Sequence, residues 1–480
     1  MVATPGMLPK LPPADKPPFF LAGAAGGVVS FGAMSTFTYA TDSATPVHPV
    51  SALDYLPVDQ MRALQLHRLQ FIVKYAYERV RLFRKRCDER GVRPEHIKTL
   101  KDIKLLPFSM KTDLRDEYPT GLQAAPNSEI VRYHCSSGTT GKPICIPNTW
   151  NDIEVWKNGV MRCLAMGGVT PNDVVQVAYG YGLFTGGLGL HYGAEAYGCA
   201  VLPISGGNTD RQIMLMKDLG VTTVACTPSY FLHILDEGQK KGIDFRKEMN
   251  LRHGFFGAEP WTEEMRDKIE EYTGLVAHDI YGLTEIAGPG VGGDCVHRTG
   301  LHIFEDHFYP EVIDPDTLEP LPDGESGELV FTTLDRTGCP MIRYRTRDLT
   351  RIEVSPCPCG RTVRRIARIN ARSDDMIIVH GVNLFPSQVE SGLLKVPEVL
   401  PHYQIVVTPT GALDTLEVKV EVTPENFSDD IRHLEELRRR VGAAVKSITG
   451  LTAKITLVEP HTLPRSEGKI RRVVDLRKKA

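Results

Sequence analysis

Residues 136–142 form the segment whose residue types best suit the binding of an anion. The segment reads Ser136-Ser137-Gly138-Thr139-Thr140-Gly141-Lys142 and is followed by Pro143. Its two glycines allow the backbone to wrap around phosphate oxygens, which the hydroxyls and the lysine can hold. The phosphate loop of kinases and GTPases needs GxxxxGK[ST] at the start of a helix, and this segment lacks that spacing. We therefore predict a phosphate loop of another kind, with an ordinary solvated loop as the alternative.

Three further motifs carry groups that suit a nucleotide and a divalent cation. Tyr281-Gly282-Leu283-Thr284-Glu285 follows the β-like run Val276 to Ile280, so a hydroxyl and a carboxylate are expected at the mouth of a sheet. Tyr344-Arg345-Thr346-Arg347-Asp348 is expected to end a strand, and Arg372-Ser373-Asp374-Asp375 precedes the last predicted domain.

Together with the 136–142 loop, these motifs resemble, in order and approximate spacing, the core motifs of the adenylate-forming superfamily. Its members are acyl-CoA ligases, peptide-synthetase adenylation domains and luciferases. Within that superfamily the chain resembles phenylacetate–CoA ligases from about residue 51 to its end. The stretches that carry this closer resemblance are Phe256-Gly257-Ala258-Glu259-Pro260-Trp261, Glu305-Asp306-His307-Phe308-Tyr309-Pro310-Glu311 and Gly381-Val382-Asn383-Leu384-Phe385-Pro386-Ser387-Gln388.

The resemblance implies an AMP-forming ligase that activates an aromatic carboxylic acid, aryl or arylacetic, with ATP and passes the acyl group to coenzyme A. One alternative is a stand-alone aryl-acid adenylating enzyme that loads a carrier protein. Another is an inactive binding protein with an adenylation fold, although Thr284, Glu285, Asp348 and Lys469 are all present.

The resemblance also implies a role for each motif. The 136–142 loop would hold the β and γ phosphates of ATP, Thr284 would bind the α-phosphate, and Glu285 would ligate Mg²⁺. Lys469, in Arg465-Ser466-Glu467-Gly468-Lys469, would neutralise charge on the α-phosphate, and Asp374 would be the hinge of a small mobile domain. Tyr281 would stack on adenine, and Asp348 would accept the ribose hydroxyls. The other implied nucleotide contacts are Gly257, Ala258, Glu259, Pro260, Asp279, Gly282, Arg368 and Arg372, and those for coenzyme A are Gly381, Val382 and Asn383.

A run of aromatic residues and glycines, residues 179–187, suits a flat apolar slot for an aromatic ring. Tyr179, Tyr181 and Phe184 supply the rings, and Gly186 is one of the glycines among which they lie. The run is predicted to line the acid pocket, as the corresponding region of phenylacetate–CoA ligases does. An ordinary turn is the alternative.

Cys357 and Cys359 form a close pair of thiols that suits one edge of a zinc site. A tetrahedral site needs two more ligands, and Cys295 with His302, or with His297, would complete a Cys₃His set. Because the protein would fill all four positions, such a zinc would be structural. Reduced free thiols are the alternative.

The composition of the whole chain limits its possible partners and locations. The 56 basic and 59 acidic residues of the 480 nearly cancel, so no nucleic-acid partner or anionic membrane is predicted. Ten scattered cysteines suit a reducing, cytoplasmic protein, and no apolar run after residue 51 is long enough to span a bilayer. Residues 1–50 are read as an N-terminal extension, flexible or docked, although 19–40 mimic a signal-peptide core. A homodimer is left open.

The elements that must position these motifs follow from hydrophobic periodicity. Helical spacing from Leu69 to Phe83 opens an α/β domain over residues 51–372. Alternating short strands and helices from about residue 170 predict parallel layering, and β-like runs at 327–334 and 341–353 predict a β subdomain. Residues 373–480 are expected to form a small, mobile α+β domain, with a strand over Leu416–Val422, a helix from Ser428 and a strand over Ile455–Val458.

Overall fold

The structure, a computed structural model, describes residues 48–136, 143–369, 371–373, 376–379, 382–410, 413–427, 431–464 and 472–477. It opens with a short 3₁₀ helix, η1 (Pro49–Tyr55), and then α1 (Val58–Arg79) and α2 (Arg81–Glu89). We expected one helix through this region. Val80 divides it, because its backbone is extended, with φ −103° and ψ 104°. Short elements follow: η2 (Pro94–His96), η3 (Leu100–Leu105), α3 (Lys111–Asp116) and η4 (Asn127–Glu129).

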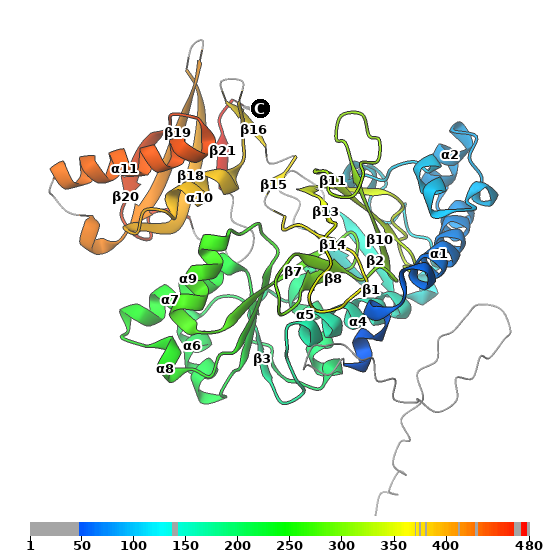
Figure 1. Ribbon diagram of the computed structural model, residues 1–480, viewed down its shortest axis with the longest axis horizontal. Coiled ribbons are helices and arrows are strands. Elements are labelled where there is room, and N and C mark those ends of the chain that lie inside the picture. The colour runs from blue at the N-terminus through cyan, green and yellow to red at the C-terminus, as the bar shows by residue number, and fades with distance from the viewer. Residues whose placement is uncertain are drawn as a thin grey trace, which may run out of the picture. The chain divides into compact units, whose positions relative to one another are not determined.

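A nine-stranded mixed sheet forms the centre of this part of the chain (Figure 1), in the order β13-β14-β9-β8-β7-β6-β5-β3-β4. The predicted parallel layering is confirmed for β4 to β7, and the sheet then continues with antiparallel strands that we did not predict. The parallel strands are β3 (Val174–Val177), β4 (Ala200–Leu202), β5 (Thr223–Cys226), β6 (His253–Gly257) and β7 (Val276–Leu283); the others are β8 (Gly288–Asp294), β9 (Leu301–Ile303), β13 (Ile352–Glu353) and β14 (Arg365–Ile366).

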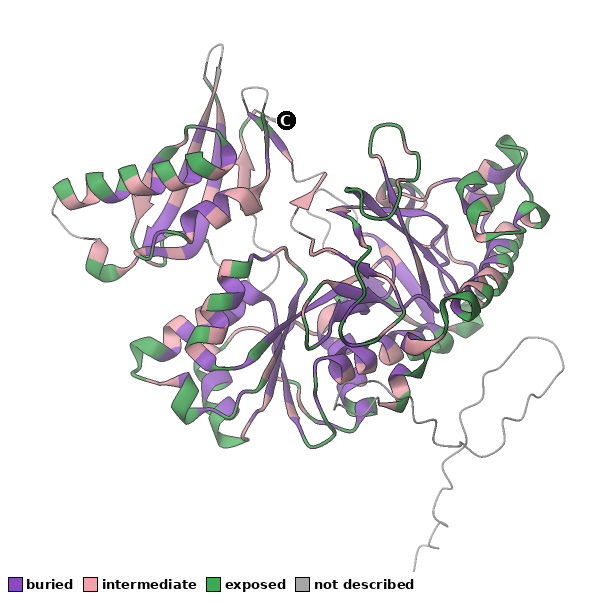
Figure 2. Ribbon diagram, viewed as in Figure 1, coloured by how far each residue is buried: buried purple, intermediate pink, exposed green. Residues whose placement is uncertain are grey.

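Helices cover both faces of this sheet, because the strands present apolar side chains on each side. Trp156 and Leu190 of α4 and α5 pack in one core cluster with Val175, whereas Phe231 of α7 packs with Phe256 in a second cluster. Figure 2 shows the sheet largely in the buried colour, with exposed residues on the outer faces of the helices. The helices are α4 (Trp150–Met166), α5 (Thr185–Tyr197), α6 (Thr209–Asp218), α7 (Pro228–Lys240), α8 (Phe245–Glu248) and α9 (Glu263–Thr273).

The predicted β subdomain is an antiparallel sheet in the order β10-β11-β12-β15. Its strands are β10 (Phe308–Ile313), β11 (Gly327–Thr333), β12 (Tyr344–Thr350) and β15 (Ala371–Arg372), and a separate hairpin pairs β1 (Ile130–Cys135) with β2 (Cys145–Thr149). The run 341–353 was expected to be one strand. It divides between β12 and β13, which belong to different sheets, so residues 344–348 lie within a strand and do not end one.

The last part of the chain has its own apolar core and the predicted α+β pattern. Its main sheet has the order β20-β19-β18-β21, and a two-stranded sheet precedes it. The elements are β16 (Ile377–Val379), β17 (Val382–Leu384), α10 (Pro386–Leu393), β18 (Val399–Thr410), β19 (Leu413–Val422), η5 (Pro424–Asn426), α11 (Ile431–Thr449), β20 (Lys454–Val458) and β21 (Val473–Asp475). Among all residues the structure describes, no helix is long and apolar enough to cross a membrane.

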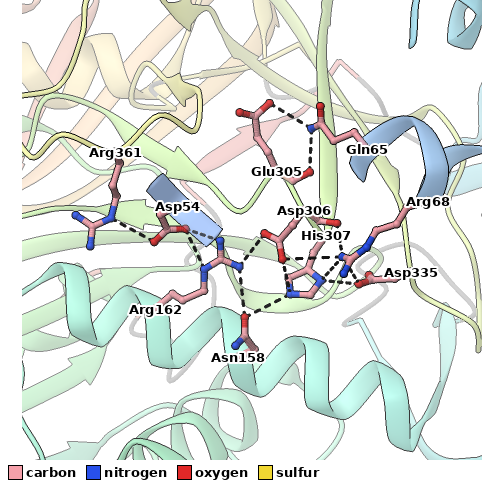
Figure 3. Close-up of polar contacts among 10 residues, drawn as sticks. All are labelled: Asp54, Gln65, Arg68, Asn158, Arg162, Glu305, Asp306, His307, Asp335 and Arg361. Carbon is pink, nitrogen blue, oxygen red and sulfur yellow. Dashed lines mark hydrogen bonds and ion pairs between the residues drawn. The ribbon is translucent and has the colours of Figure 1, made fainter. Parts of the chain in front are cut away.

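A buried ionic network holds the first helical segments to the central domain (Figure 3). The Arg162 guanidinium of α4 donates to Asp54 of η1 and, at 2.8 Å, to Asp306, and all three side chains are fully buried. Arg68 of α1 donates to the Asp306 carbonyl oxygen and to Asp335. Glu305 pairs at 2.7 Å with both Arg62 and Arg364. Glu305 and Asp306 of the 305–311 motif therefore act as internal ionic partners in this structure.

Candidate active site

Thr284 and Glu285 lie in the tight turn between β7 and β8, at the carboxyl end of a parallel strand. The turn requires glycine at 282, because a Cβ there would lie 1.6 Å from the carbonyl oxygen of Gly288. The Thr284 hydroxyl lies 3.4 Å from that of Thr185, the first residue of α5. The carboxyl ends of parallel strands are where α/β proteins place their ligands, so the turn is well situated for a nucleotide.

Glu285 is buried and held by groups from distant segments. Its carboxylate lies 3.2 Å from the Nζ of Lys111, at the start of α3, and the Tyr344 hydroxyl hydrogen-bonds to it. Burial, followed by the Glu285 charge, raises the pKa of Tyr344 well above its ordinary value, so the phenol stays a hydrogen-bond donor. Arg336 donates to the Glu285 and Ile286 carbonyl oxygens and thereby supports the turn. A buried carboxylate beside a half-buried lysine suits a site that receives a cation.

A second group brings together Tyr281, Asp348 and Arg372. The Tyr281 hydroxyl donates to Asp348 at 2.6 Å, and Nη1 of Arg372 donates to the other carboxylate oxygen at 3.0 Å. Asp348 and Arg372 face each other across β12 and β15. The structure therefore joins three residues that lie far apart in the sequence around one buried carboxylate.

The stretch 257–260 leaves β6 in a strained conformation. Ala258 has φ +70°, a left-handed value that side chains other than glycine rarely adopt and that is concentrated at functional sites. A Cβ at Gly257 would lie 2.2 Å from the carbonyl oxygen of Ile280, so β6 and β7 approach closely there. Glu259 accepts a hydrogen bond from the Ser229 amide at the start of α7, which engages its carboxylate in capping a helix. Pro260 follows this turn directly.

Asp279 and Arg368 lie together beside a polar cavity of about 250 Å³. Their side chains are 3.4 Å apart, and the Arg368 guanidinium lies over the Trp261 ring at 4.2 Å. Burial raises the pKa of Asp279, while Arg368 opposes this rise. Arg266 and Asp294, paired at 2.7 Å, line the same cavity.

The aromatic run 179–187 is divided between different environments. Tyr179 is buried, and its hydroxyl hydrogen-bonds to the backbone of Gly257. A Cβ at Gly186 would lie 3.2 Å from the Tyr179 ring, so glycine at this position lets the ring pack closely against the start of α5. The Tyr181 hydroxyl instead meets His191 at 3.2 Å, and Phe184 is about half exposed, at 49%. Tyr179 therefore contacts the 257–260 turn.

Cys295, His302, Cys357 and Cys359 form a buried cluster whose ligand atoms all lie within 4.8 Å of one another. The Sγ atoms of Cys295 and Cys357 are 3.6 Å apart, and Nε2 of His302 is 3.4 Å from Sγ of Cys359. A tetrahedral zinc with bonds of about 2.3 Å to sulfur and 2.0 Å to nitrogen needs ligand separations of this size. The donor set and its spacing therefore fit zinc. The cluster contains His302 and not His297.

Several predicted site residues lie outside the described residues: Ser137, Gly138, Thr139, Thr140, Gly141, Lys142, Asp374, Gly381 and Lys469. Some predicted site residues next to these are described. Ser136 follows β1, and its amide donates to the Ile144 carbonyl oxygen at 3.2 Å. Val382 and Asn383 belong to β17, and Val382 is exposed.

Four residues around the site were not predicted from the sequence: Lys111, Thr185, Arg336 and Tyr344. Tyr344 begins the motif that ends at Asp348, so its motif was a signal that we did not use. Lys111 and Arg336 lie in segments without any motif, and their approach to Glu285 depends on the packing of α3 and of the loop after β11.

Comparison with known proteins defines the class first. Residues 54–334 match the family described as AMP-binding enzyme, and residues 381–477 match the AMP-binding enzyme C-terminal domain. A solved structure of 2-hydroxyisobutyryl-CoA ligase, in complex with an acyl-AMP, has a TM-score of 0.84 at 29% identity and covers 92% of this chain and 95% of its own. The chain is thus an AMP-binding enzyme with the adenylate-forming fold that the sequence predicted.

Relatives among characterised proteins narrow the family. The phenylacetate–coenzyme A ligase of Thermus thermophilus is 50% identical over 89% of this chain and 99% of the relative. That of Aromatoleum evansii is 48% identical over 90% and 100%, and that of Escherichia coli 47% identical over 88% and 96%. The chain belongs to the phenylacetate–CoA ligase family, as its motifs predicted.

Proposed function

We propose that this protein is an AMP-forming ligase that converts an arylacetic acid, with ATP and coenzyme A, into the acyl-CoA thioester. The observation that carries the proposal is the convergence of Thr284, Glu285, Tyr281 and Asp348 at the carboxyl end of β7, in a chain about half identical to phenylacetate–CoA ligases. In the first step a carboxylate oxygen of the acid attacks the α-phosphorus of ATP, and pyrophosphate leaves. In the second the coenzyme A thiol, losing its proton, attacks the acyl carbon and AMP leaves.

Charge stabilisation is the main task in the first step, because anionic oxygens gather at the α-phosphorus. We assign Thr284 to the α-phosphate and residues 136–142 to the β and γ phosphates. Glu285 would hold Mg²⁺, which supplies positive charge beside the phosphates when bound. Lys111, which pairs with Glu285, would then be free to turn toward phosphate oxygens.

The nucleoside is assigned to Tyr281, Asp348 and Arg372, with the turn 257–260 and the Asp279–Arg368 pair beside it. Asp348 would accept the ribose hydroxyls, and its buried carboxylate, oriented by Tyr281 and Arg372, supports that role. Tyr179 and Gly186 are proposed to line the acid pocket.

Asp348→Asn should raise the KM for ATP by about 10- to 100-fold, because a hydrogen bond to a charged acceptor contributes about 1.5–3 kcal/mol. The KM for the acid should change little. Initial-rate measurements with each substrate varied would check this, with Tyr281→Phe as the control that keeps the carboxylate. Equal losses in the two variants would contradict a direct role for Asp348.

We also propose that Cys295, His302, Cys357 and Cys359 hold a structural zinc ion. The protein would carry about one zinc per chain, and Cys359→Ser should lower the metal content and reduce the unfolding temperature by several degrees, because metal binding adds to the free energy of folding. Elemental analysis and thermal unfolding would test this. Cys199→Ser, a buried thiol elsewhere, should leave both values unchanged. Wild-type protein without zinc but with the same unfolding temperature would contradict the assignment.

The domain assignment remains our proposal: an extension over 1–50, an adenylate-forming domain over 51–372 and a mobile domain over 373–480. The separate core from Ile377 onward supports the last boundary. Lys469 would serve the first step, and rotation about Asp374 would bring residues 381–383 to coenzyme A. Asp374→Pro should leave adenylation intact and slow thioester formation; equal loss of both steps would argue against a hinge.

ATP–pyrophosphate exchange tests the function directly. The panel should contain phenylacetate, benzoate and an aminobenzoate, with an assay without acid as the control. We expect exchange with phenylacetate, release of AMP and formation of phenylacetyl-CoA from free coenzyme A. Exchange without transfer to coenzyme A, but with transfer to a carrier protein, would favour the alternative acceptor. No exchange with any aromatic acid would overturn the proposal.

We further propose a cytoplasmic location, and size-exclusion measurements would decide the open question of a homodimer.

A further inference from the structure

Two cysteines lie opposite each other in the hairpin whose strands flank the predicted phosphate loop in the sequence. Cys135 ends β1 and Cys145 begins β2, and they are register partners in the antiparallel hairpin. Their Sγ atoms are 3.3 Å apart, compared with 3.6 Å between those of Cys295 and Cys357. In the sequence the two cysteines bracket residues 136–144, which include the whole predicted phosphate loop.

The backbone at this position suits a cross-strand disulfide. The Ser136 amide donates to Ile144, whereas the Cys135 amide donates outside the hairpin, to Leu183 at 2.9 Å. Cys135 and Cys145 are therefore a non-hydrogen-bonded pair, in which Cα atoms are about 4.5 Å apart and side chains are closest. This separation lies within the range of about 4.4–6.8 Å found for disulfides. Bond formation at about 2.05 Å would require the sulfur atoms to approach by only about 1.3 Å.

The surroundings connect this pair to the other parts of the site. The Leu183 carbonyl oxygen accepts from the Cys135 amide and lies 3.1 Å from Nδ1 of His134. Leu183 belongs to the aromatic run, and two residues later Thr185 contacts Thr284. A shift of β1 toward β2 would therefore act on the phosphate loop that β1 enters, and on the segment that carries the predicted acid pocket.

We propose that Cys135 and Cys145 are a redox modification site, at which a peroxide forms a disulfide that reversibly lowers adenylation. Cys145 is the more exposed thiol, so its sulfur would attack the peroxide oxygen first, giving a sulfenic acid and water. The Cys135 sulfur then attacks that sulfur, and a second water leaves. In sum two thiols lose two electrons and two protons, and hydrogen peroxide becomes two waters. A dithiol reductant restores both thiols by exchange.

The chemical environment sets the rate of this reaction. Burial, followed by the hydrogen bond with Cys145, raises the pKa of Cys135 to about 11. Because the thiolate is the reactive form, the second step, in which Cys135 attacks, should be slow at neutral pH and faster as the pH rises. The disulfide is therefore expected to accumulate under sustained oxidation.

The experiment treats the full-length protein with hydrogen peroxide, maps disulfides by mass spectrometry of unreduced peptides, and measures ATP–pyrophosphate exchange in parallel. We expect a Cys135–Cys145 cross-link and a loss of exchange of about 10- to 100-fold, the size produced by displacing reacting groups by about 1 Å. Dithiothreitol should restore activity. Cys145→Ser should keep its exchange activity after oxidation, whereas the matched variant Cys339→Ser, which removes another buried thiol, should lose activity as the wild type does.

Three results would overturn the proposal: no cross-link between these cysteines, a cross-link with unchanged exchange, or the same loss of activity in Cys145→Ser. The effect on adenylation rests on the proposed function. Reduced protein without exchange on any acid would count against that function, and the peptide map would still decide whether the disulfide forms.

Discussion

Replacement of Glu285 by glutamine is expected to lower ATP–pyrophosphate exchange by about 10²- to 10³-fold, the usual loss when one charged group that stabilises the transition state is removed. Glutamine keeps the size of the side chain and its hydrogen bond with Tyr344, but it removes the negative charge. A neutral amide cannot ligate Mg²⁺ as a carboxylate does, and it leaves Lys111 without its ionic partner at 3.2 Å. The measurement is exchange with phenylacetate over a range of Mg²⁺ concentrations.

The Mg²⁺ dependence of exchange tests whether Glu285 binds the cation. If Glu285 holds the cation, the variant should need a higher Mg²⁺ concentration for half-maximal exchange. A loss of exchange that is the same at every Mg²⁺ concentration would contradict this role. Glu425→Gln, a change of the same type at an exposed position, should leave the profile unaltered. An unchanged thermal unfolding curve would show that the Glu285 variant is folded.

Replacement of Arg162 by methionine is expected to lower the free energy of unfolding by about 3–5 kcal/mol, because it leaves buried carboxylates without their cation. Asp54 and Asp306 lie on either side of the guanidinium, as Figure 3 shows, and both carboxylates are fully buried. Chemical denaturation would measure the loss. The same substitution at Arg439, whose ion pair with Glu436 is exposed, should cost less than about 1 kcal/mol.

The loss at Arg162 should depend on pH with a definite sign. Burial acts to raise the pKa of Asp306, but Arg162, with His307 and Arg68, holds it well below its ordinary value. A lowered pKa in the folded state contributes stability above the ordinary carboxyl pKa, and that contribution disappears as the pH falls. In the Arg162→Met variant burial raises the pKa of Asp306 without the opposing charge of Arg162. The Asp306 carboxyl therefore takes up a proton more readily than in the wild type. The difference between the two proteins should therefore narrow as the pH falls below the ordinary carboxyl pKa of about 3.9; a constant difference would indicate lost packing alone.

Patterns within single segments of the sequence determined much of this protein's fold and family. The alternation over Leu416–Val422 predicted β19, and the order of the motifs at 136–142, 281–285 and 344–348 predicted the adenylate-forming superfamily. Such predictions succeed because side-chain periodicity reports which face of one strand or helix is buried, and motif order is a property of the chain itself. The Cys₃His set was also predictable by residue type, although two histidines were candidates for its fourth member.

Tertiary structure decided the rest. His302 lies on β9 beside the cysteines because β9 pairs with β8 and β14, and no local pattern specifies that pairing. The same reason explains the division of 341–353 between two sheets and the approach of Lys111 and Tyr344 to Glu285. It also explains why Cys135 meets Cys145: the hairpin register sets which side chains face each other, and a shift of one residue would turn the thiols to opposite faces. Sequence specifies the groups available for chemistry, whereas strand order and register select which of them meet.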